Sequence, residues 1–135
     1  MAQAEVDEVV DAVVDAVVQA LAGADAKGLR DHLDTDTMLH MPGSSGLAGD
    51  YQGREAITGL LERMSAASDG TLGFTTEAVG AGPSGGLRLS GVVRGRRLGC
   101  TLSLVTTIDI DVVDGVIREA RLSCEDQTTW DAFWR

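Results

Sequence analysis

Three polar side chains are candidates for acid–base chemistry on a small molecule. His40 could act as a general base or acid, because an unperturbed histidine has a pKa of about 6.5, or it could be a structural histidine bonded to the neighbouring loop. Tyr51, the only tyrosine, could polarise a carbonyl or anchor the glycine-rich loop around it. Asp126 could serve as a carboxylate base or as the N-cap of a terminal segment. These residue types are suited to proton transfer.

The last segment predicted to be a strand carries a charged pair. Side chains alternate along a strand, so Glu119, Arg121 and Ser123 share one face. Burial penalises a lone charge, so a buried pair of Glu119 and Arg121 would fit a structural role as well as a catalytic one. Near the end of the chain, Trp130 and Trp134 could stack on a ligand, or could plug the fold or a dimer interface.

Metal and nucleotide chemistry find little support in the sequence. The two histidines and two cysteines are scattered rather than clustered, and no glycine-rich loop matches a phosphate-binding fingerprint. We therefore expect neither a metal nor another cofactor. Cys100 and Cys124 lack C-x-x-C spacing, and we expect both to be free thiols in a reducing compartment.

The charge of the chain is strongly acidic and unevenly distributed. The net charge is −10, and residues 1–50 contain ten acidic residues but only two basic ones. Such a surface repels phosphate backbones, so we do not expect nucleic-acid binding. No apolar run approaches the roughly 20 residues of a membrane span, and no basic region followed by an apolar block begins the chain. We expect a cytoplasmic protein with no membrane contact.

Helices come first along the chain. The valines of residues 5–22 recur at the i, i+3, i+4, i+7 spacing of one helical face, which predicts a helix there. A shorter helix is expected at 25–33 and a third at 54–67. Between them, 37–41 is a short predicted strand ended by Pro42, which cannot donate to a ladder, and a flexible glycine-rich loop follows.

Strands follow the helices. We predict them at residues 72–81, 87–95, 97–112 and 116–125. A tight turn is expected at 94–96, and Asp114-Gly115 is a dipeptide that type I′ hairpin turns prefer. Consecutive hairpins indicate an antiparallel, curved sheet wrapped around a helix, with a concave pocket. The 135 residues form one α+β domain spanning 1–135.

Four pieces of sequence resemble SnoaL-like members of the nuclear transport factor 2 and ketosteroid isomerase-like superfamily. They are HMPG…LAGDYQGREAI from His40, S-x-G-T from Ser68, DGVIREA from Asp114 and the terminal D-x-x-x-x-D-x-F-W. The resemblance implies a cone of curved, mainly antiparallel sheet, closed by three helices of the N-terminal half, with a pocket inside. It also implies a homodimer through the outer face of the sheet.

The resemblance further implies which residues line the pocket. Side chains of the first strand, including His40, and the face carrying Glu119, Arg121 and Ser123 are expected to point into it. The family hosts isomerases, cyclases, epoxide hydrolases, dehydratases and binding proteins, so it does not specify the chemistry. The position of the ketosteroid isomerase base is occupied here by Met41, and the epoxide hydrolase and polyketide cyclase layouts each lack a carboxylate as well.

Two hypotheses follow from this resemblance. The first is a cofactor-independent cyclase, isomerase or dehydratase that moves a proton on a hydrophobic, carbonyl-containing, polyketide- or terpenoid-like substrate. The second is a non-catalytic protein that binds a hydrophobic ligand or forms dimers. The predicted catalytic residues are His40, Tyr51, Arg121 and Asp126, and the predicted substrate contacts are Met41, Glu119, Ser123, Trp130 and Trp134.

Overall fold

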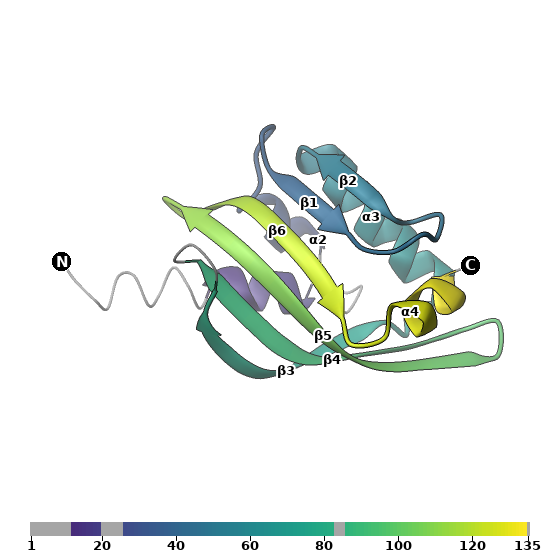
Figure 1. Cartoon of the computed structure of the whole chain (residues 1–135). Helices are drawn as coiled ribbons and strands as arrows, with labels where there is room; N and C mark the ends of the chain where they lie inside the picture. Colours follow the sequence, from purple (N-terminus) through teal and green to yellow (C-terminus); the bar gives the residue numbers. More distant parts are fainter. Residues whose placement is uncertain (1–11, 20–25, 83–85, 135) are drawn as a thin grey trace.

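The structure of the chain, a computed structural model, describes residues 12–19, 26–82 and 86–134. Its centre is a six-stranded sheet with the strand order β2-β1-β6-β5-β4-β3 (Figure 1). Neighbouring strands are antiparallel, except that β1 and β6 run parallel. The strands are β1 (Met38–Met41), β2 (Gly49–Gln52), β3 (Gly73–Ala81), β4 (Leu87–Arg97), β5 (Cys100–Val113) and β6 (Val116–Cys124).

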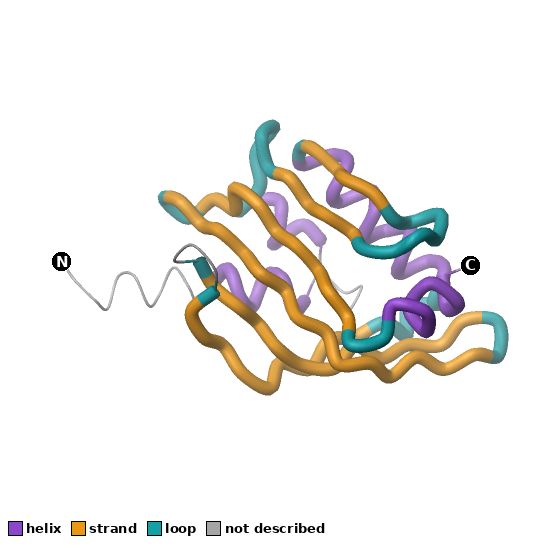
Figure 2. The backbone as a smooth tube through the Cα atoms, viewed as in Figure 1, coloured by secondary structure: helices purple, strands orange, loops and turns teal. Residues whose placement is uncertain are grey.

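Helices close the concave side of this curved sheet. The helical residues 12–19, α2 (Ala26–Arg30) and α3 (Arg54–Ala67) lie on that side, and α4 (Gln127–Trp134) follows β6 at one end (Figure 2). The predicted α+β class and the predicted cone of mainly antiparallel sheet closed by helices are therefore confirmed. Of the predicted first helix, only residues 12–19 lie within the described part of the chain, and they are helical.

The core lies between the concave face of the sheet and the helices. Alternate residues of β5 are buried, as expected for a strand with one face in the core, and α3 buries residues at helical spacing. Burying one such aliphatic side chain contributes about 1.5–3 kcal/mol. The buried residues of these two elements include Leu102, Leu104, Ile108 and Ile110 from β5 and Ile57, Leu60, Leu61 and Met64 from α3.

The glycine-rich segment before α3 contains a strand that the sequence did not predict. β2 pairs with β1 over four residues, from Met38 opposite Gln52 to Met41 opposite Gly49. Three of the four β2 residues are exposed, so this edge strand lacks the hydrophobic alternation by which a strand is recognised in sequence. Tyr51 consequently lies on a strand and not in a flexible loop.

The hairpin between β4 and β5 turns later than predicted. The turn is at Leu98 and Gly99, which both have positive φ, of 52° and 80°, as a type I′ turn requires. The predicted turn residue Gly95 lies inside β4, where an added Cβ would be 3.4 Å from Leu72 and 3.6 Å from Phe133. These are ordinary contact distances, so Gly95 is a strand residue that packs beside Leu72 and Phe133 and does not make a turn. The predicted Asp114-Gly115 turn is confirmed, with φ of 53° and 79°.

None of the helices in the described ranges is long and apolar enough to cross a bilayer.

Candidate functional site

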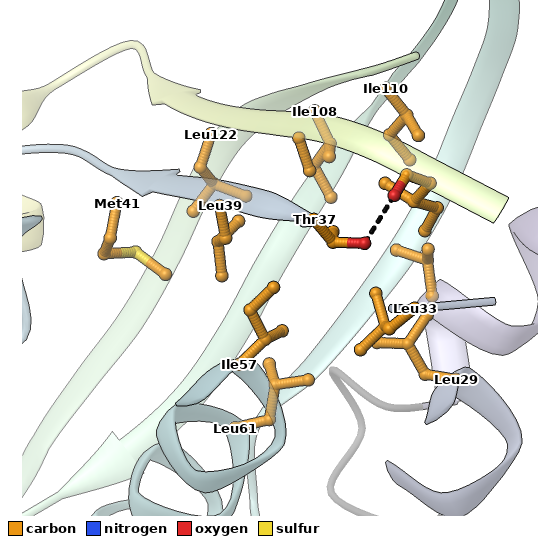
Figure 3. A pocket seen from close by; sticks show the side chains of 13 residues that line it. Leu29, Leu33, Thr37, Leu39, Met41, Ile57, Leu61, Ile108, Ile110 and Leu122 are labelled. Atoms are coloured by element: carbon orange, nitrogen blue, oxygen red, sulfur yellow. Dashed lines mark hydrogen bonds between the residues drawn. The ribbon is translucent and has the colours of Figure 1, made fainter. Parts of the chain in front are cut away.

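An apolar cavity lies between the concave face of the sheet and the helices (Figure 3). The space open to the centres of water-sized spheres is about 50 Å³. The side chains of Leu39 and Met41 of β1 point across this space towards α3, where Ile57 and Leu61 lie. The cavity is lined by Val17, Leu29, Leu33, Thr37, Leu39, Met41, Ile57, Leu61, Ile108, Ile110, Ile117, Ala120 and Leu122.

Among the described residues of the wall, Thr37 alone has a polar side chain, and its hydroxyl is already hydrogen-bonded. Thr37 is 1% exposed, and its Oγ1 donates to the carbonyl oxygen of Ile117 at 2.6 Å. The same oxygen accepts from the backbone N–H of Asp34 at 3.0 Å. The hydroxyl therefore joins the start of β1 to β6, and the described wall offers a ligand only carbon and one sulfur.

The alternation of β1 places its polar and apolar side chains on opposite sides of the sheet. Leu39 and Met41 are buried and line the cavity, whereas His40 is absent from the lining. Successive side chains of a strand point to opposite faces, so His40 belongs to the outer face. The expectation that His40 lines the pocket is wrong, whereas Met41 does lie in the cavity wall.

The face of β6 that carries Glu119, Arg121 and Ser123 is also the outer face. These residues share a face, as predicted, but the cavity is lined by Ile117, Ala120 and Leu122 instead. The expectation that the polar face points inward is therefore wrong. Its physical reason is that burying charged groups among aliphatic side chains carries a large desolvation cost, whereas the alternate apolar residues gain from burial.

His40 is held on the outer face by two carboxylates. Its Nδ1 lies 2.6 Å from an oxygen of Asp50 on β2, and its Nε2 lies 2.5 Å from an oxygen of Glu119 on β6. The hydrogen bond with Asp50, followed by that with Glu119, raises the pKa of His40 above its ordinary value. Burial and the nearby positive charge of Arg121 lower this pKa less strongly. A carboxylate oxygen within hydrogen-bond distance of each ring nitrogen favours the protonated form of His40, and the ring bridges β2, β1 and β6.

The other predicted catalytic residues do not meet His40 at one site. The Tyr51 hydroxyl donates to the carbonyl of Leu47 at 2.8 Å, and the guanidinium of Arg63 lies 5.9 Å from the centre of its ring. This placement fits the loop-anchor interpretation of Tyr51. Arg121 is exposed on the outer face, with its guanidinium 3.8 Å from Glu119. Neither side chain is part of the described cavity wall.

Asp126 caps the start of α4. Its carboxylate accepts from the hydroxyl of Thr129 at 2.7 Å and from the backbone N–H of Thr129 at 3.2 Å. These hydrogen bonds, that of the hydroxyl first, lower the pKa of the carboxyl group. The geometry is that of an aspartate N-cap, which was one of the two interpretations of this residue.

The aromatic residues of α4 fill one end of the cone. Trp130 is 1% exposed, Phe133 and Trp134 are 5% exposed, and Trp134 packs edge-to-face against both of the other rings. Asp131 fastens the helix to the loop after β1, because its carboxylate accepts from the backbone N–H of Ser44 at 3.0 Å. None of these aromatic rings is among the cavity-lining residues, so the two predicted tryptophan contacts lie outside the cavity.

The described part of the chain presents no clear metal centre. Within it, no three side chains of His, Cys, Asp or Glu come together as a set that could hold a metal ion. Both cysteines are free thiols, and burial raises the pKa of Cys124 to about 11. Cys124 is therefore protonated at neutral pH and unsuited to nucleophilic attack.

Comparisons with known proteins identify the fold. No protein-family model matches the sequence, and no curated protein matches it at the sequence level. Bal32a, from a soil-derived mobile gene cassette, has a TM-score of 0.87 at 27% identity, covering 96% of this chain and 98% of its own. An NTF2-like protein of Burkholderia xenovorans has a TM-score of 0.72 at 22% identity, covering 96% and 97%. The chain has the nuclear transport factor 2-like fold.

A proposed SnoaL-like polyketide cyclase from Shewanella denitrificans shares the same fold. Its TM-score is 0.67 at 16% identity, and the match covers 90% of this chain and 93% of that chain. The structural likeness shows the fold that the sequence motifs led us to expect. At this level of identity, it says nothing about a shared reaction.

Of the described residues that line the cavity of this nuclear transport factor 2-like fold, only Met41 was predicted as a site residue. The other predicted site residues are polar or aromatic, whereas the described wall consists, apart from Thr37, of apolar residues from six elements and from Leu33. The available signal was the apolar spacing of the helices and of the alternate strand positions. That signal identifies buried residues but cannot separate those that border a cavity from those that pack fully.

Proposed function

We propose that this protein binds a small hydrophobic molecule in the cavity without catalysing a reaction on it. The observation that carries the proposal is the chemistry of the wall, which contains no titratable side chain among the described residues. A pocket with an aliphatic wall removes apolar surface of a ligand from water, which is sufficient for binding.

Proton transfer finds little support in this geometry. A general base must lie within about 2.6–3.2 Å of the proton that it takes, directly or through one water. His40 faces the opposite side of β1 from Leu39 and Met41, and both of its ring nitrogens are engaged by carboxylates. The likeness to a proposed polyketide cyclase supports the shared fold. The catalytic hypothesis also needs a group in the cavity that accepts a proton, and no described residue of the wall has a titratable side chain.

Two further expectations accompany this proposal. A homodimer through the outer sheet face is supported by the resemblance and by the exposure of Val105 on that face, at 43%. A location in the cytoplasm is supported by the free thiols of Cys100 and Cys124. Size-exclusion chromatography with light scattering tests the first of these expectations, and fractionation of the native host cell tests the second.

The binding proposal is tested with substitutions in β6 that add a large side chain either inside the cavity or on the outer face. Ala120→Leu adds bulk on the cavity side of β6, whereas Ser123→Leu adds similar bulk on the outer face of the same strand. Hydrophobic compounds of increasing size, including linear poly-carbonyl and polycyclic ones, are titrated while thermal melting and tryptophan fluorescence are followed. We expect binding to wild type and to Ser123→Leu, and its loss in Ala120→Leu.

The same panel separates a binding protein from an enzyme. Product formation is followed by mass spectrometry in wild type and in His40→Ala. Binding without turnover, unchanged in His40→Ala, supports the proposal. Turnover that disappears in His40→Ala would overturn it in favour of proton transfer, and equal binding by Ala120→Leu would show that the ligand site lies elsewhere.

A further inference from the structure

We infer that the ligands of this cavity are compact hydrocarbons of about five to eight carbon atoms that carry no hydrogen-bonding group. The inference rests on the proposed binding function and names the chemical class that the site takes. Three properties support it: the volume of the cavity, the absence of free polar side-chain atoms among the described wall residues, and the absence of aromatic rings among them.

The volume limits the ligand to a small molecule. One water needs about 10–15 Å³ when space is measured by the positions of its centre, so 50 Å³ corresponds to roughly three to five waters. At about 30 Å³ of liquid volume for each water, this space is close to that of a cavity that holds benzene. A polycyclic polyketide is several times larger and would require displacement of the close-packed wall.

The described residues of the wall offer no free hydrogen-bond partner for an oxygen or nitrogen of the ligand. The hydroxyl of Thr37 is bonded to Ile117 and Asp34, and the strand residues of the wall lie in a paired sheet. A ligand hydroxyl or carbonyl would lose its hydrogen bonds to water on entry and gain none. We therefore expect such a group to weaken binding by about 10- to 100-fold relative to a methyl group of similar size.

Apart from Thr37, the described residues of the wall have branched or linear apolar side chains, and none of them is aromatic. Leu39 and Met41 face Ile57 and Leu61 across the space, as Figure 3 shows. Without a ring to stack on, an aromatic ligand gains no geometric preference over a saturated ring of the same size. The selected class is therefore defined by apolarity and compactness, and it includes alicyclic as well as aromatic hydrocarbons.

The class is tested with ligand pairs of matched size. Methylcyclohexane is compared with cyclohexanol, and toluene with phenol, by NMR titration of the wall methyl groups in sealed samples. We expect methylcyclohexane and toluene to bind with similar affinity, and each to bind about 10- to 100-fold more tightly than its hydroxyl partner. Perhydroanthracene, a tricyclic hydrocarbon, is expected to bind more weakly than methylcyclohexane.

The outcomes separate failure of the class from failure of the binding function. If cyclohexanol binds as tightly as methylcyclohexane, or perhydroanthracene binds more tightly, the class is wrong while the site remains. If no probe binds wild type, or if Ala120→Leu and the milder Ala120→Val bind as well as wild type, the proposed function fails too. Ser123→Leu is the matched control and should keep wild-type affinity, and the melting temperature of each variant checks its folding.

Discussion

The two faces of β1 and β6 differ as strongly as any two regions of this protein. On the concave side, Leu39, Met41 and Leu122 border a cavity whose described wall has no charged group. On the outer side of the same strands, His40 lies between the carboxylates of Asp50 and Glu119. The comparison shows that the ionisable residues of these two strands do not border the apolar cavity.

The outer face continues as a row of charges across the sheet. His40 is paired in register with Arg121, Arg121 with Asp109, and Asp109 with Arg88. Arg88 forms two hydrogen bonds with Asp109, at 2.6 and 2.9 Å. The oppositely charged pairs in this row, Arg121 with Asp109 and Asp109 with Arg88, stabilise strand pairing modestly, because these groups remain in contact with water. The outer face thus carries ion pairs in contact with water, whereas the buried apolar side chains of the inner face stabilise the fold.

The largest contrast is expected between adjacent residues on opposite faces of β6. Leu122→Ala removes buried methyl groups and should lower the free energy of unfolding by about 2–5 kcal/mol. Ser123→Ala changes an exposed side chain and should stay within about 0.5 kcal/mol of wild type. Urea unfolding of both variants measures the difference. Equal effects would contradict the assignment of the two faces.

A smaller effect is expected at the one polar side chain of the cavity wall. Thr37→Val leaves the Ile117 carbonyl and the Asp34 N–H without their hydroxyl partner and should cost about 1–3 kcal/mol. Thr37→Ser keeps the hydroxyl and serves as the control, with only the loss of a methyl group. If the free energy of unfolding of Thr37→Val equalled that of wild type, the hydrogen bonds of the Thr37 hydroxyl would make no net contribution to stability.

The outer cluster is expected to make stability depend on pH. The pKa of His40 is raised on folding, so the stabilisation by its proton is complete below the unfolded pKa of about 6.5. It is lost as the pH rises through the higher pKa of the folded state. Compared with His40→Gln, wild type should be more stable by about 0.5–1 kcal/mol near pH 6, and the gap should close at alkaline pH.

Thermal melting of wild type and His40→Gln from pH 6 to pH 9 measures this gap, and NMR titration of the imidazole gives the pKa directly. A gap that widens as the pH rises would have the wrong sign for a proton held between two carboxylates. If the affinity for a ligand changed with pH as His40 titrates, the outer face and the cavity would be coupled through β1, whereas we expect the two faces to act independently.

The smallest effect is expected for Arg121→Ala. Arg121 is exposed on the outer face and lies 3.8 Å from Glu119, so its removal should change the free energy of unfolding by less than about 0.5 kcal/mol. Affinity for methylcyclohexane should be unchanged as well, because the guanidinium does not border the cavity. A loss of affinity on this substitution would place the ligand on the outer face.

Much of the local structure could be predicted from the sequence. The boundaries of α3 at Arg54 and Ala67 agree with the prediction, and the Asp114-Gly115 turn follows from a dipeptide with a strong conformational preference. β2 was missed because it has no hydrophobic alternation and exists through its pairing with β1. The turn at Leu98 was missed because leucine seldom adopts positive φ, so no residue marks it.

The candidate site could be predicted only in part. Met41 was named as a ligand contact and lines the cavity, whereas the polar residues named beside it lie elsewhere. The β5–β6 register pairs Asp111 with Glu119 but Val112 with Ile117, so Arg118 is an extra residue in β6. Such a bulge changes which residues of a strand point inward, and no feature of a single sequence gives its position.

The sequence by itself determined that Glu119, Arg121 and Ser123 share a face, because no bulge interrupts the side-chain alternation between them. It also determined the order of the helices and strands from α2 to β6, apart from β2, since apolar spacing and turn residues act over short distances. Only the tertiary structure decided which face of each strand points inward, because that depends on apolar residues contributed by all the packed elements. It likewise decided that His40 meets Asp50 and Glu119, which lie 10 and 79 residues away in the chain and join it through the pairing of three strands.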